Sequence, residues 1–339
     1  MISKKDLDEI SDLSQDFLRD AGSQTVLVTG GTGFVGTWIV ESLLRCGGNS
    51  TRLVLVVRSR SKAEKRLGKF LQNAKVEFLE QDVSKKIEFK GTVDQIWHLA
   101  TSTGLPNGKS SIDIASSTIL GTFRLLDLAS NQSSPPKFLH TSSGAVYGRG
   151  LNPDVEVTED LRLFNDWLGG GEVYDSSKRA AEMILQEATK EGVVSAKNAR
   201  LFAFVGPYLP LDSHFAIGNF IRSALDSKPI TLTSSGVDYR SYLYAADLVS
   251  WLFTYMHSDF SEPLNIGSDQ ALTIKESAEL VGSIVNVDVF TNSHDAHEAT
   301  KYVPNIDLAR SVLGLDVYTD LTESIRRTIE WHKSQPNVK

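Results

Sequence analysis

The sequence predicts an α/β protein built on a doubly wound parallel sheet. From residue 25 onward, short apolar stretches typical of buried strands alternate with stretches of helical periodicity. Such alternation predicts parallel strands joined by right-handed crossovers, with helices on both faces of the sheet. A glycine-rich turn directly after the first apolar stretch supports the same fold class. The expected strands lie at residues 25–29, 53–57, 76–79, 95–99, 137–141 and 199–204.

The glycine-rich turn follows the strand Thr25-Val-Leu-Val-Thr29. Gly30, Gly33 and Gly36 are spaced by threes, and an apolar helical pattern begins behind them. The N–H groups and the positive dipole of such a helix start bind pyrophosphate. The run Gly31-Thr-Gly33-Phe-Val-Gly36 also matches the looser dinucleotide fingerprint. We therefore predict a Rossmann domain with a dinucleotide site. The expected cofactor contacts in this turn come from Gly30, Thr32, Gly33, Phe34, Val35 and Gly36.

Composition and charge narrow the class of protein. Of 339 residues, 41% are hydrophobic and 23% are charged, which is typical of globular chains. The net charge of −7, without a long basic run, argues against a nucleic-acid partner. No apolar run reaches the roughly 18 residues of a membrane helix, and the N-terminus has no apolar core of a secretory signal. The single cysteine, Cys46, excludes an internal disulfide and a multi-cysteine metal site, so we expect a cytoplasmic protein without a metal.

Three regions are expected along the chain. Apolar residues at helical spacing over 3–20 predict an N-terminal helical extension (1–22), which precedes the Rossmann domain (23–206). After Gly206-Pro207 the alternation weakens, which predicts a smaller mixed α/β substrate lobe (207–339), some segments of which are able to return to the sheet. Ligands of open α/β sheets bind at the carboxyl edge, so we expect the site there, between the lobes. The lobe's expected helices are 215–226, 245–257, 274–285 and 320–334, with strands near 230–233 and 263–266.

The end of the second strand indicates which cofactor is bound. It reads Arg58-Ser59-Arg60, where an NAD site usually places an acidic residue on the ribose 2′-hydroxyl. Arginine instead binds the 2′-phosphate of NADP(H), so this sequence favours NADP(H), with NAD(H) still open. The alternative is that these arginines only solvate a loop.

Other cofactor contacts are expected at the ends of the third, fourth and fifth strands. Asp82 and Val83 would border the adenine, or Asp82 would cap the next turn. The fourth strand ends near the centre of the cofactor, where Ala100 is small enough for close approach, whereas His98 is expected to be structural. The remaining residues that we assign to the cofactor site are Leu99, Thr101 and Thr141.

A tyrosine and a lysine carry the predicted chemistry. Tyr174 and Lys178 are four residues apart, which places them on one helical face, and Ser143 ends a strand some thirty residues earlier. Hydride transfer to or from an alcohol carbon also moves the hydroxyl proton. A free tyrosine with a pKa of about 10 is a poor base, but a neighbouring ammonium stabilises the phenolate. We therefore predict Ser143, Tyr174 and Lys178 as catalytic, the alternative being a surface tyrosine–lysine pair. Ser143 is also expected to bind the substrate oxygen, and Tyr174 and Lys178 are also expected to contact the cofactor.

Taken in order, these motifs resemble the extended short-chain dehydrogenase/reductases that modify nucleotide sugars. The family comprises epimerases, 4,6-dehydratases, decarboxylases and 4-keto reductases, and the resemblance spans about residues 24–335, including Gly206-Pro207 and the later run Arg240-Ser-Tyr-Leu-Tyr-Ala-Ala-Asp247. It implies a nicotinamide cofactor, a C-terminal lobe that binds a nucleoside-diphosphate sugar, and a homodimer. By this resemblance Arg240 contacts the diphosphate and Asn219 the diphosphate or nucleotide, although Arg240 would alternatively pair with Asp247.

Departures from the family pattern narrow the expected reaction. Family dehydratases resemble one another in an Asp-Glu pair after the hydroxyl residue, and decarboxylases have a Glu, but this chain has Gly144 and Ala145 there. Thr118 and Ala203 stand where the family often has asparagine, which leaves the sugar pose open. We predict hydride transfer at C4, with reduction of a nucleotide-linked 4-keto (6-deoxy) hexose ahead of 4-epimerisation. A non-catalytic dinucleotide sensor and a dehydrogenase of free aldehydes or flavonoid-type ketones remain the alternatives.

Overall fold

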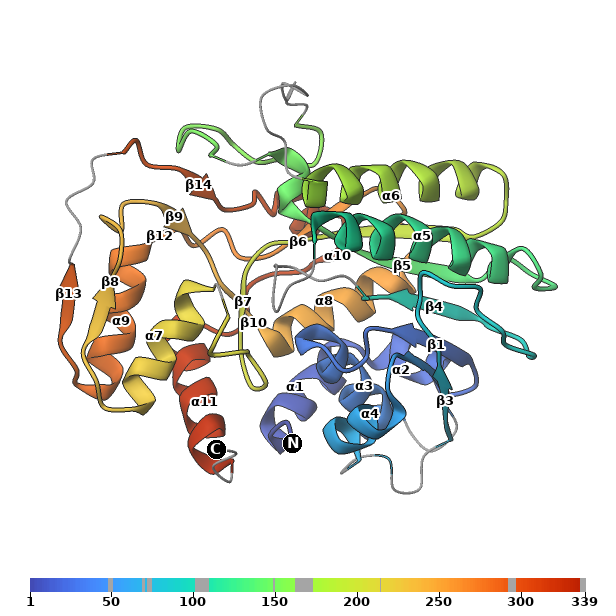
Figure 1. Cartoon of the computed structure of the whole chain (residues 1–339), viewed down its shortest axis with the longest axis horizontal. Coiled ribbons are helices and arrows are strands. Elements are labelled where there is room, and N and C mark those ends of the chain that lie inside the picture. Colours follow the sequence, from blue (N-terminus) through green and yellow to red (C-terminus); the bar gives the residue numbers. More distant parts are fainter. Residues whose placement is uncertain are drawn as a thin grey trace. The chain divides into compact units, whose positions relative to one another are not determined.

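A seven-stranded sheet forms the centre of the fold, as the alternating pattern predicts. The computed structural model describes residues 1–47, 51–68, 71, 75–100, 110–148, 150–161, 173–213, 215–291 and 297–335. The strand order is β11-β6-β5-β4-β1-β2-β3, and the pairs from β3 to β6 are parallel (Figure 1). The expected fold class is confirmed. The strands are β1 Thr25–Thr29, β2 Arg52–Val57, β3 Val76–Glu80, β4 Gln95–His98, β5 Lys137–Ser143, β6 Ser195–Leu201 and β11 Leu264–Ile266.

The order of the strands reverses beside β1. Chain order runs from β1 to β3 in one direction, and then from β4 to β6 on the other side of β1. In open α/β sheets the ligand crevice lies outside the carboxyl ends of the strands at this reversal. The glycine turn after β1 therefore lies at the position where open α/β sheets bind their ligands.

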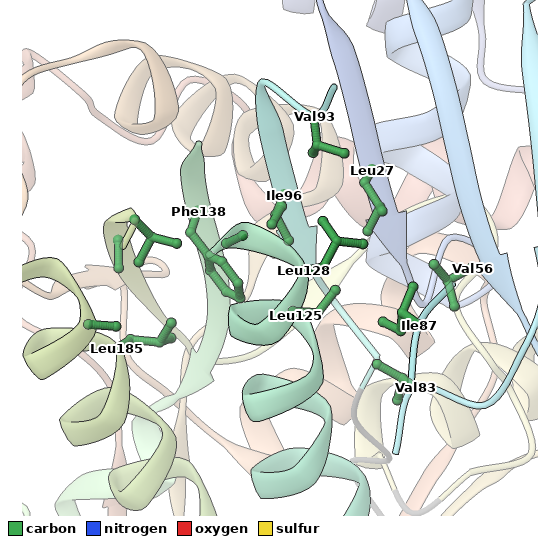
Figure 2. Packing of buried hydrophobic residues seen from close by; sticks show 14 of the residues in the cluster. Leu27, Val56, Val83, Ile87, Val93, Ile96, Leu125, Leu128, Phe138 and Leu185 are labelled. Carbon is green, nitrogen blue, oxygen red and sulfur yellow. The ribbon is translucent and has the colours of Figure 1, made fainter. Parts of the chain in front are cut away.

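The α-helices between β1 and β6 in the chain cover the sheet and complete its hydrophobic core. They are α3 Phe34–Cys46, α4 Arg60–Leu67, α5 Ser111–Ala129 and α6 Val173–Lys190. Helices α5 and α6 lie side by side (Figure 1), and their inner side chains meet those of the sheet in one buried hydrophobic cluster. Figure 2 shows Leu125 and Leu128 of α5 packed between Leu27, Ile96 and Phe138 of the strands. Removal of this apolar area from water stabilises the sheet–helix arrangement.

The N-terminal extension forms two helices where the periodicity predicted one. They are α1 Lys4–Leu13 and α2 Gln15–Ala21, and the backbone of Ser14 (φ −131°) interrupts the helix between them. Phe17 of α2 stacks on Phe253 at a centroid distance of 4.4 Å and meets the Trp97 ring edge-on at 5.8 Å. The extension is therefore part of the aromatic core, not an addition to the surface.

Two further expectations about strands need correction. The predicted strand at 199–204 is two strands, because β6 ends at Leu201 and β7 Phe204–Val205 pairs with β10 Leu243–Tyr244. Strand β6 begins earlier than its apolar residues indicate, since its buried centre contains Lys197 and Asn198. Lys197 donates to the carbonyls of Ser258 and Phe260, so its polar atoms are satisfied and hydropathy alone misses the strand. The strand expected near 263–266 is β11, which joins the central sheet.

The chain divides into two compact units. The first contains the strands β1 to β6, the helices α1 to α6, and Val249–Leu264, which includes most of helix α8 Ala245–His257. The second contains the described residues of 147–161, Phe202–Leu248 and the chain from Asn265 onward. None of the described helices has the length and apolarity needed to cross a lipid bilayer.

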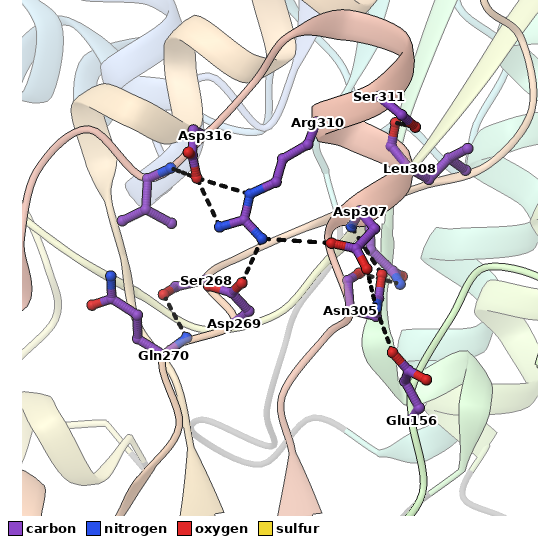
Figure 3. A network of polar contacts seen from close by, with 12 residues as sticks. Glu156, Ser268, Asp269, Gln270, Asn305, Asp307, Leu308, Arg310, Ser311 and Asp316 are labelled. Atoms are coloured by element: carbon purple, nitrogen blue, oxygen red, sulfur yellow. Dashed lines mark hydrogen bonds and ion pairs between the residues drawn. The ribbon is translucent and has the colours of Figure 1, made fainter.

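The second unit is built from helices and very short strands. Its helices are α7 Ala216–Leu225, α9 Ile274–Val285, α10 Asp307–Leu313 and α11 Leu321–Ser334. Its strands are β7, β10, β8 Ile230–Leu232, β9 Tyr239–Arg240, β12 Leu272–Thr273, β13 Val289–Thr291 and β14 Lys301–Tyr302. Figure 3 shows Arg310 at the centre of an ion-pair network, 2.6 Å from Asp269 and 2.8 Å from Asp316. These side chains are partly exposed, so water screens the network and its contribution to stability is small.

Candidate active site

The turn after β1 needs glycine at two positions for steric reasons. Gly30 has a positive φ of 72°, and a β-carbon there would lie 2.6 Å from the Leu99 carbonyl group. A β-carbon on Gly36 would lie 2.1 Å from the carbonyl oxygen of Gly30. The absence of these side chains brings the end of β4 and the first turn of α3 against the loop. The backbone of the loop therefore packs directly against the neighbouring backbone.

The start of α3 is open to an anion. Gly33 is its N-cap, in extended backbone, and makes no side-chain cap. Thr32 and Gly33 are exposed, and Phe34 and Val35 are half-buried. The first N–H groups of a helix have no intrahelical acceptor, so an uncapped and accessible start fits a pyrophosphate.

The ends of β1 and β4 meet beside this loop. The Ala100 amide donates to the Thr29 hydroxyl at 3.3 Å, and the Leu99 amide donates to the Thr29 carbonyl at 3.2 Å. Leu99 and Ala100 are half-buried, and Thr101 lies outside the described residues. Leu99 and Ala100, which directly follow β4 and were predicted to contact the cofactor, are thus held against the glycine turn.

The two arginines after β2 differ in their surroundings. Arg60 pairs with Glu64 at 2.8 Å, and its guanidinium lies over the Phe78 ring at 5.6 Å. Arg58 is exposed and has no ion-pair partner among the residues that the structure describes. Ser59 caps α4, because its hydroxyl accepts from the Lys62 amide. Arg58 is therefore the more available cation.

Asp82 and Val83 take part in local structure. The Asp82 carboxylate accepts from the amide of Ser84 at 2.9 Å and from its hydroxyl at 2.7 Å, which is the turn-capping alternative. Val83 is buried in the hydrophobic cluster shown in Figure 2. Both contacts hold the segment after β3 in place at the carboxyl edge of the sheet.

Strand β5 and helix α6 carry the predicted catalytic residues. Ser143 is the last residue of β5, and its hydroxyl accepts from the Ala145 amide at 3.2 Å. Tyr174 lies half-buried in the first turn of α6. One turn later, the Lys178 ammonium donates to the carbonyl of Thr141, two residues before Ser143. The Thr141 hydroxyl donates to the His98 carbonyl at 3.1 Å, which ties the end of β5 to β4.

Lys178 has an unusual electrostatic environment. Its side chain is only 1% exposed, and burial lowers its pKa from 10.5 to about 7, while the negative charge of Glu182 acts against this shift. His98 and His140 lie near it and stack at a centroid distance of 5.8 Å. Burial, and then the charge of Lys178, lower the pKa of both histidines, that of His98 to about 3. Both rings are therefore neutral at physiological pH.

Sequence reasoning missed the residues that support Lys178. Glu182 accepts hydrogen bonds from the Ser142 hydroxyl and from Arg200, whose Nη2 lies 2.9 Å from its Oε2. The i,i+4 spacing of Lys178 and Glu182 was a readable signal. The contributions of Ser142 and Arg200 depend on tertiary contacts, so no sequence pattern indicated them.

Of the residues assigned to the substrate, Ser143 lies in the first unit, and Asn219 and Arg240 lie in the second. The Asn219 amide group donates to the Ser213 carbonyl at 3.0 Å. Arg240, half-buried on β9, donates to the Tyr239 carbonyl at 2.7 Å, and its guanidinium lies 5.9 Å from the centre of the Tyr302 ring. The Asp247 carboxylate accepts from the backbone amides of Tyr318 and Thr319 and from the Thr319 hydroxyl.

The departures from the family pattern have structural counterparts. Gly144 and Ala145 begin the short 3₁₀ helix Gly144–Tyr147 directly after Ser143, and neither carries an ionisable group. Thr118 is fully buried, and its hydroxyl donates to the Ile114 carbonyl at 2.9 Å. The Ala203 carbonyl accepts from the Leu243 amide at 3.0 Å.

Comparison with known proteins identifies the family. The model of the NAD dependent epimerase/dehydratase family matches residues 26–267, which is more than half of the chain. The chain belongs to this family. Its membership confirms the resemblance to the extended short-chain dehydrogenase/reductases, and it is an enzyme family that uses nicotinamide cofactors.

Members of the family with different activities are similar to this chain. UDP-glucuronic acid decarboxylase 1 of Danio rerio is 29% identical over 322 residues, covering 93% of this chain and 74% of that protein. The UDP-N-acetylglucosamine 4-epimerase of Methanobrevibacter ruminantium, solved with UDP-N-acetylmuramic acid, has a TM-score of 0.76 and 20% identity, covering 93% and 99% of the two chains. The dTDP-glucose 4,6-dehydratase of Bacillus anthracis, solved with NAD, has a TM-score of 0.75 and 20% identity, covering 92% and 97%. At these identities the two structures show the fold alone.

Proposed function

We propose that this protein reduces the 4-keto group of a nucleoside-diphosphate hexose. Two observations at the end of β5 and on α6 support the proposal. On α6, Lys178 is buried one helical turn from Tyr174, and after β5 the two residues that follow Ser143 have no acidic or basic side chain. Such a site is equipped for hydride transfer coupled to one proton. It has no second carboxyl at Gly144 or Ala145 to eliminate water or abstract a C5 proton.

Each of the three residues has a distinct task in this reaction. When bound, the nicotinamide supplies the hydride that reaches C4. Tyr174 gives its phenolic proton to the substrate oxygen as the carbonyl electron pair moves onto it. Ser143 hydrogen-bonds the same oxygen and fixes its position. The Lys178 ammonium stabilises the phenolate that remains and would hold the nicotinamide ribose hydroxyls.

We propose NADP(H) as the cofactor, with Arg58 on its 2′-phosphate. Arg58 is exposed at the carboxyl end of β2, whereas Arg60 is engaged by Glu64 and by the Phe78 ring. A phosphate dianion is bound best by a guanidinium that has no competing carboxylate. A reductase that consumes its cofactor in each cycle also fits NADPH.

Arg240 and Asn219 are the proposed residues for the diphosphate and the nucleotide. Arg240 uses one nitrogen on the Tyr239 carbonyl and retains further N–H donors for an anion. Asn219 donates to Ser213 and keeps its side-chain oxygen as an acceptor. The similar 4-epimerase binds a UDP sugar, which supports a substrate of this class.

A 4-epimerase is the second candidate, because it needs the same tyrosine and lysine and no further acid. The test supplies NADPH with several nucleotide 4-keto-6-deoxy sugars and follows cofactor absorbance. Oxidation of NADPH together with a new 4-hydroxy sugar is the expected result. Interconversion of two nucleotide sugars without net NADPH consumption would assign epimerisation instead. Release of carbon dioxide from UDP-glucuronic acid, the activity in the name of the Danio rerio relative, would contradict both.

A further inference from the structure

Lys178 carries its charge where water does not reach it. It is 1% exposed, and its ammonium donates to the neutral Thr141 carbonyl. Burial of an ammonium is unfavourable and favours loss of its proton unless a nearby negative charge compensates for it. Burial has already brought the pKa of Lys178 down to about 7. A small change in its surroundings would therefore decide whether it is charged at neutral pH.

Glu182 is the carboxylate that opposes this effect. It follows Lys178 by four residues on α6, so both side chains project from one face of the helix. Its negative charge raises the pKa of Lys178 against the effect of burial. Glu182 itself is only 9% exposed, so its field acts through protein with little screening by solvent.

Two neighbouring strands hold the Glu182 carboxylate. The Ser142 hydroxyl of β5 donates to Oε1, while Arg200 of β6 donates from Nε at 3.2 Å to Oε1 and from Nη2 at 2.9 Å to Oε2. Tyr255 of α8 lies near both charges, and burial raises its pKa, so its hydroxyl stays neutral. The carboxylate therefore has one orientation, and Ser142 connects it to the strand that ends in Ser143.

Other titratable groups also lie around Lys178. His98 of β4 and His140 of β5 are buried and neutral. Asp175, three residues earlier on α6, is buried as well. Within the described part of the chain, the Glu182 charge acts to raise the pKa of Lys178 against the effect of burial.

We infer that Glu182 is a positioning residue whose carboxylate, fixed by Ser142 and Arg200, balances the buried charge of Lys178. The inference rests on the proposed function, in which Lys178 acts as an ammonium beside Tyr174. It extends the catalytic group from three residues to a network that reaches across β5 and β6.

The first test is the pH profile of kcat in Glu182→Gln. Activity falls at high pH as Lys178 loses its proton, and removal of the carboxylate moves this fall to lower pH by about one unit. Glu182→Asp keeps the negative charge, so its activity is expected to fall at the same high pH as that of the wild type. Glu187→Gln removes an exposed carboxylate of the same helix and is the matched control, with no shift expected. An unshifted limb in Glu182→Gln, or an equal shift in Glu182→Asp, would overturn the inference.

The second test does not need turnover. The Lys178 side-chain carbon next to the ammonium is titrated by NMR in the NADPH-bound protein, with Lys178→Met to assign its signal. A lower pKa in Glu182→Gln than in the wild type is expected, and equal values, or a drop in Asp175→Asn alone, would contradict the inference. Absence of turnover with every sugar would count against the proposed function and leave this titration intact. If Glu182→Gln does not fold, Arg200→Gln removes the competing cation, and the Lys178 pKa must then rise.

Discussion

The glycine turn after β1 and the β5–α6 pair, the two halves of the proposed site, are built by different physical means. The turn is defined by atoms that are absent, because a β-carbon on Gly30 or Gly36 would overlap neighbouring backbone. The β5–α6 pair is defined by buried charges, with Lys178 balanced by Glu182. A steric site of the first kind is insensitive to pH, whereas the second depends on protonation. Binding and chemistry in this protein should therefore respond to different perturbations.

The largest expected effect separates chemistry from binding. Tyr174→Phe removes the proton donor and leaves the glycine turn unchanged, so kcat should fall about 10²–10⁴-fold with unchanged NADPH affinity. Single-turnover kinetics and fluorescence titration of NADPH measure the two quantities. Tyr318→Phe, at an exposed tyrosine that donates to the Gly314 carbonyl, is the control and should retain full activity. Turnover that survives Tyr174→Phe would show that Tyr174 is not the proton donor, and the β5–α6 pair would then not be distinguished from the glycine turn by its chemistry.

The next effect concerns the steric half. Gly36→Ala forces a β-carbon against the Gly30 carbonyl oxygen, so the free energy of unfolding should fall by about 1–3 kcal/mol, with loss of cofactor binding. Gly33→Ala is the matched variant, because its β-carbon would lie 3.3 Å from the same oxygen and requires only a small adjustment. Urea unfolding of both variants measures the difference. Equal destabilisation would show that packing at Gly36 does not define the turn.

The smallest effect tests the cofactor at the edge of the site. Arg58→Ala should weaken NADPH binding about tenfold, because a charge-assisted bond to the 2′-phosphate is lost, and leave NADH binding unchanged. Arg60→Ala is the control, since Arg60 is already paired with Glu64. Both dissociation constants are measured by fluorescence titration. A wild-type protein that binds NADH more tightly than NADPH would reject the proposed preference.

The contrast between the two halves also explains which parts of the site the sequence predicted. Gly30, Gly33 and Gly36 could be read directly, because glycine spacing after an apolar run has few other uses. Tyr174 and Lys178 could be paired by their spacing on a helix. The break at Ser14 and the early start of β6 were not predicted, since both depend on contacts with distant segments. In β6 the buried Lys197 is satisfied by carbonyls more than sixty residues away in sequence, which no local pattern reports.

The sequence by itself determined the parallel sheet, the glycine-rich helix start and which side chains are proposed to react, because these follow from local periodicity and residue type. Only the tertiary structure decided that Lys178 is buried, that Glu182 balances it, and that Arg58 and not Arg60 is available to an anion. Burial and charge pairing are properties of chain segments brought together by folding. They set the free energy of an ionised group, and therefore whether a residue of the right type also has the right charge.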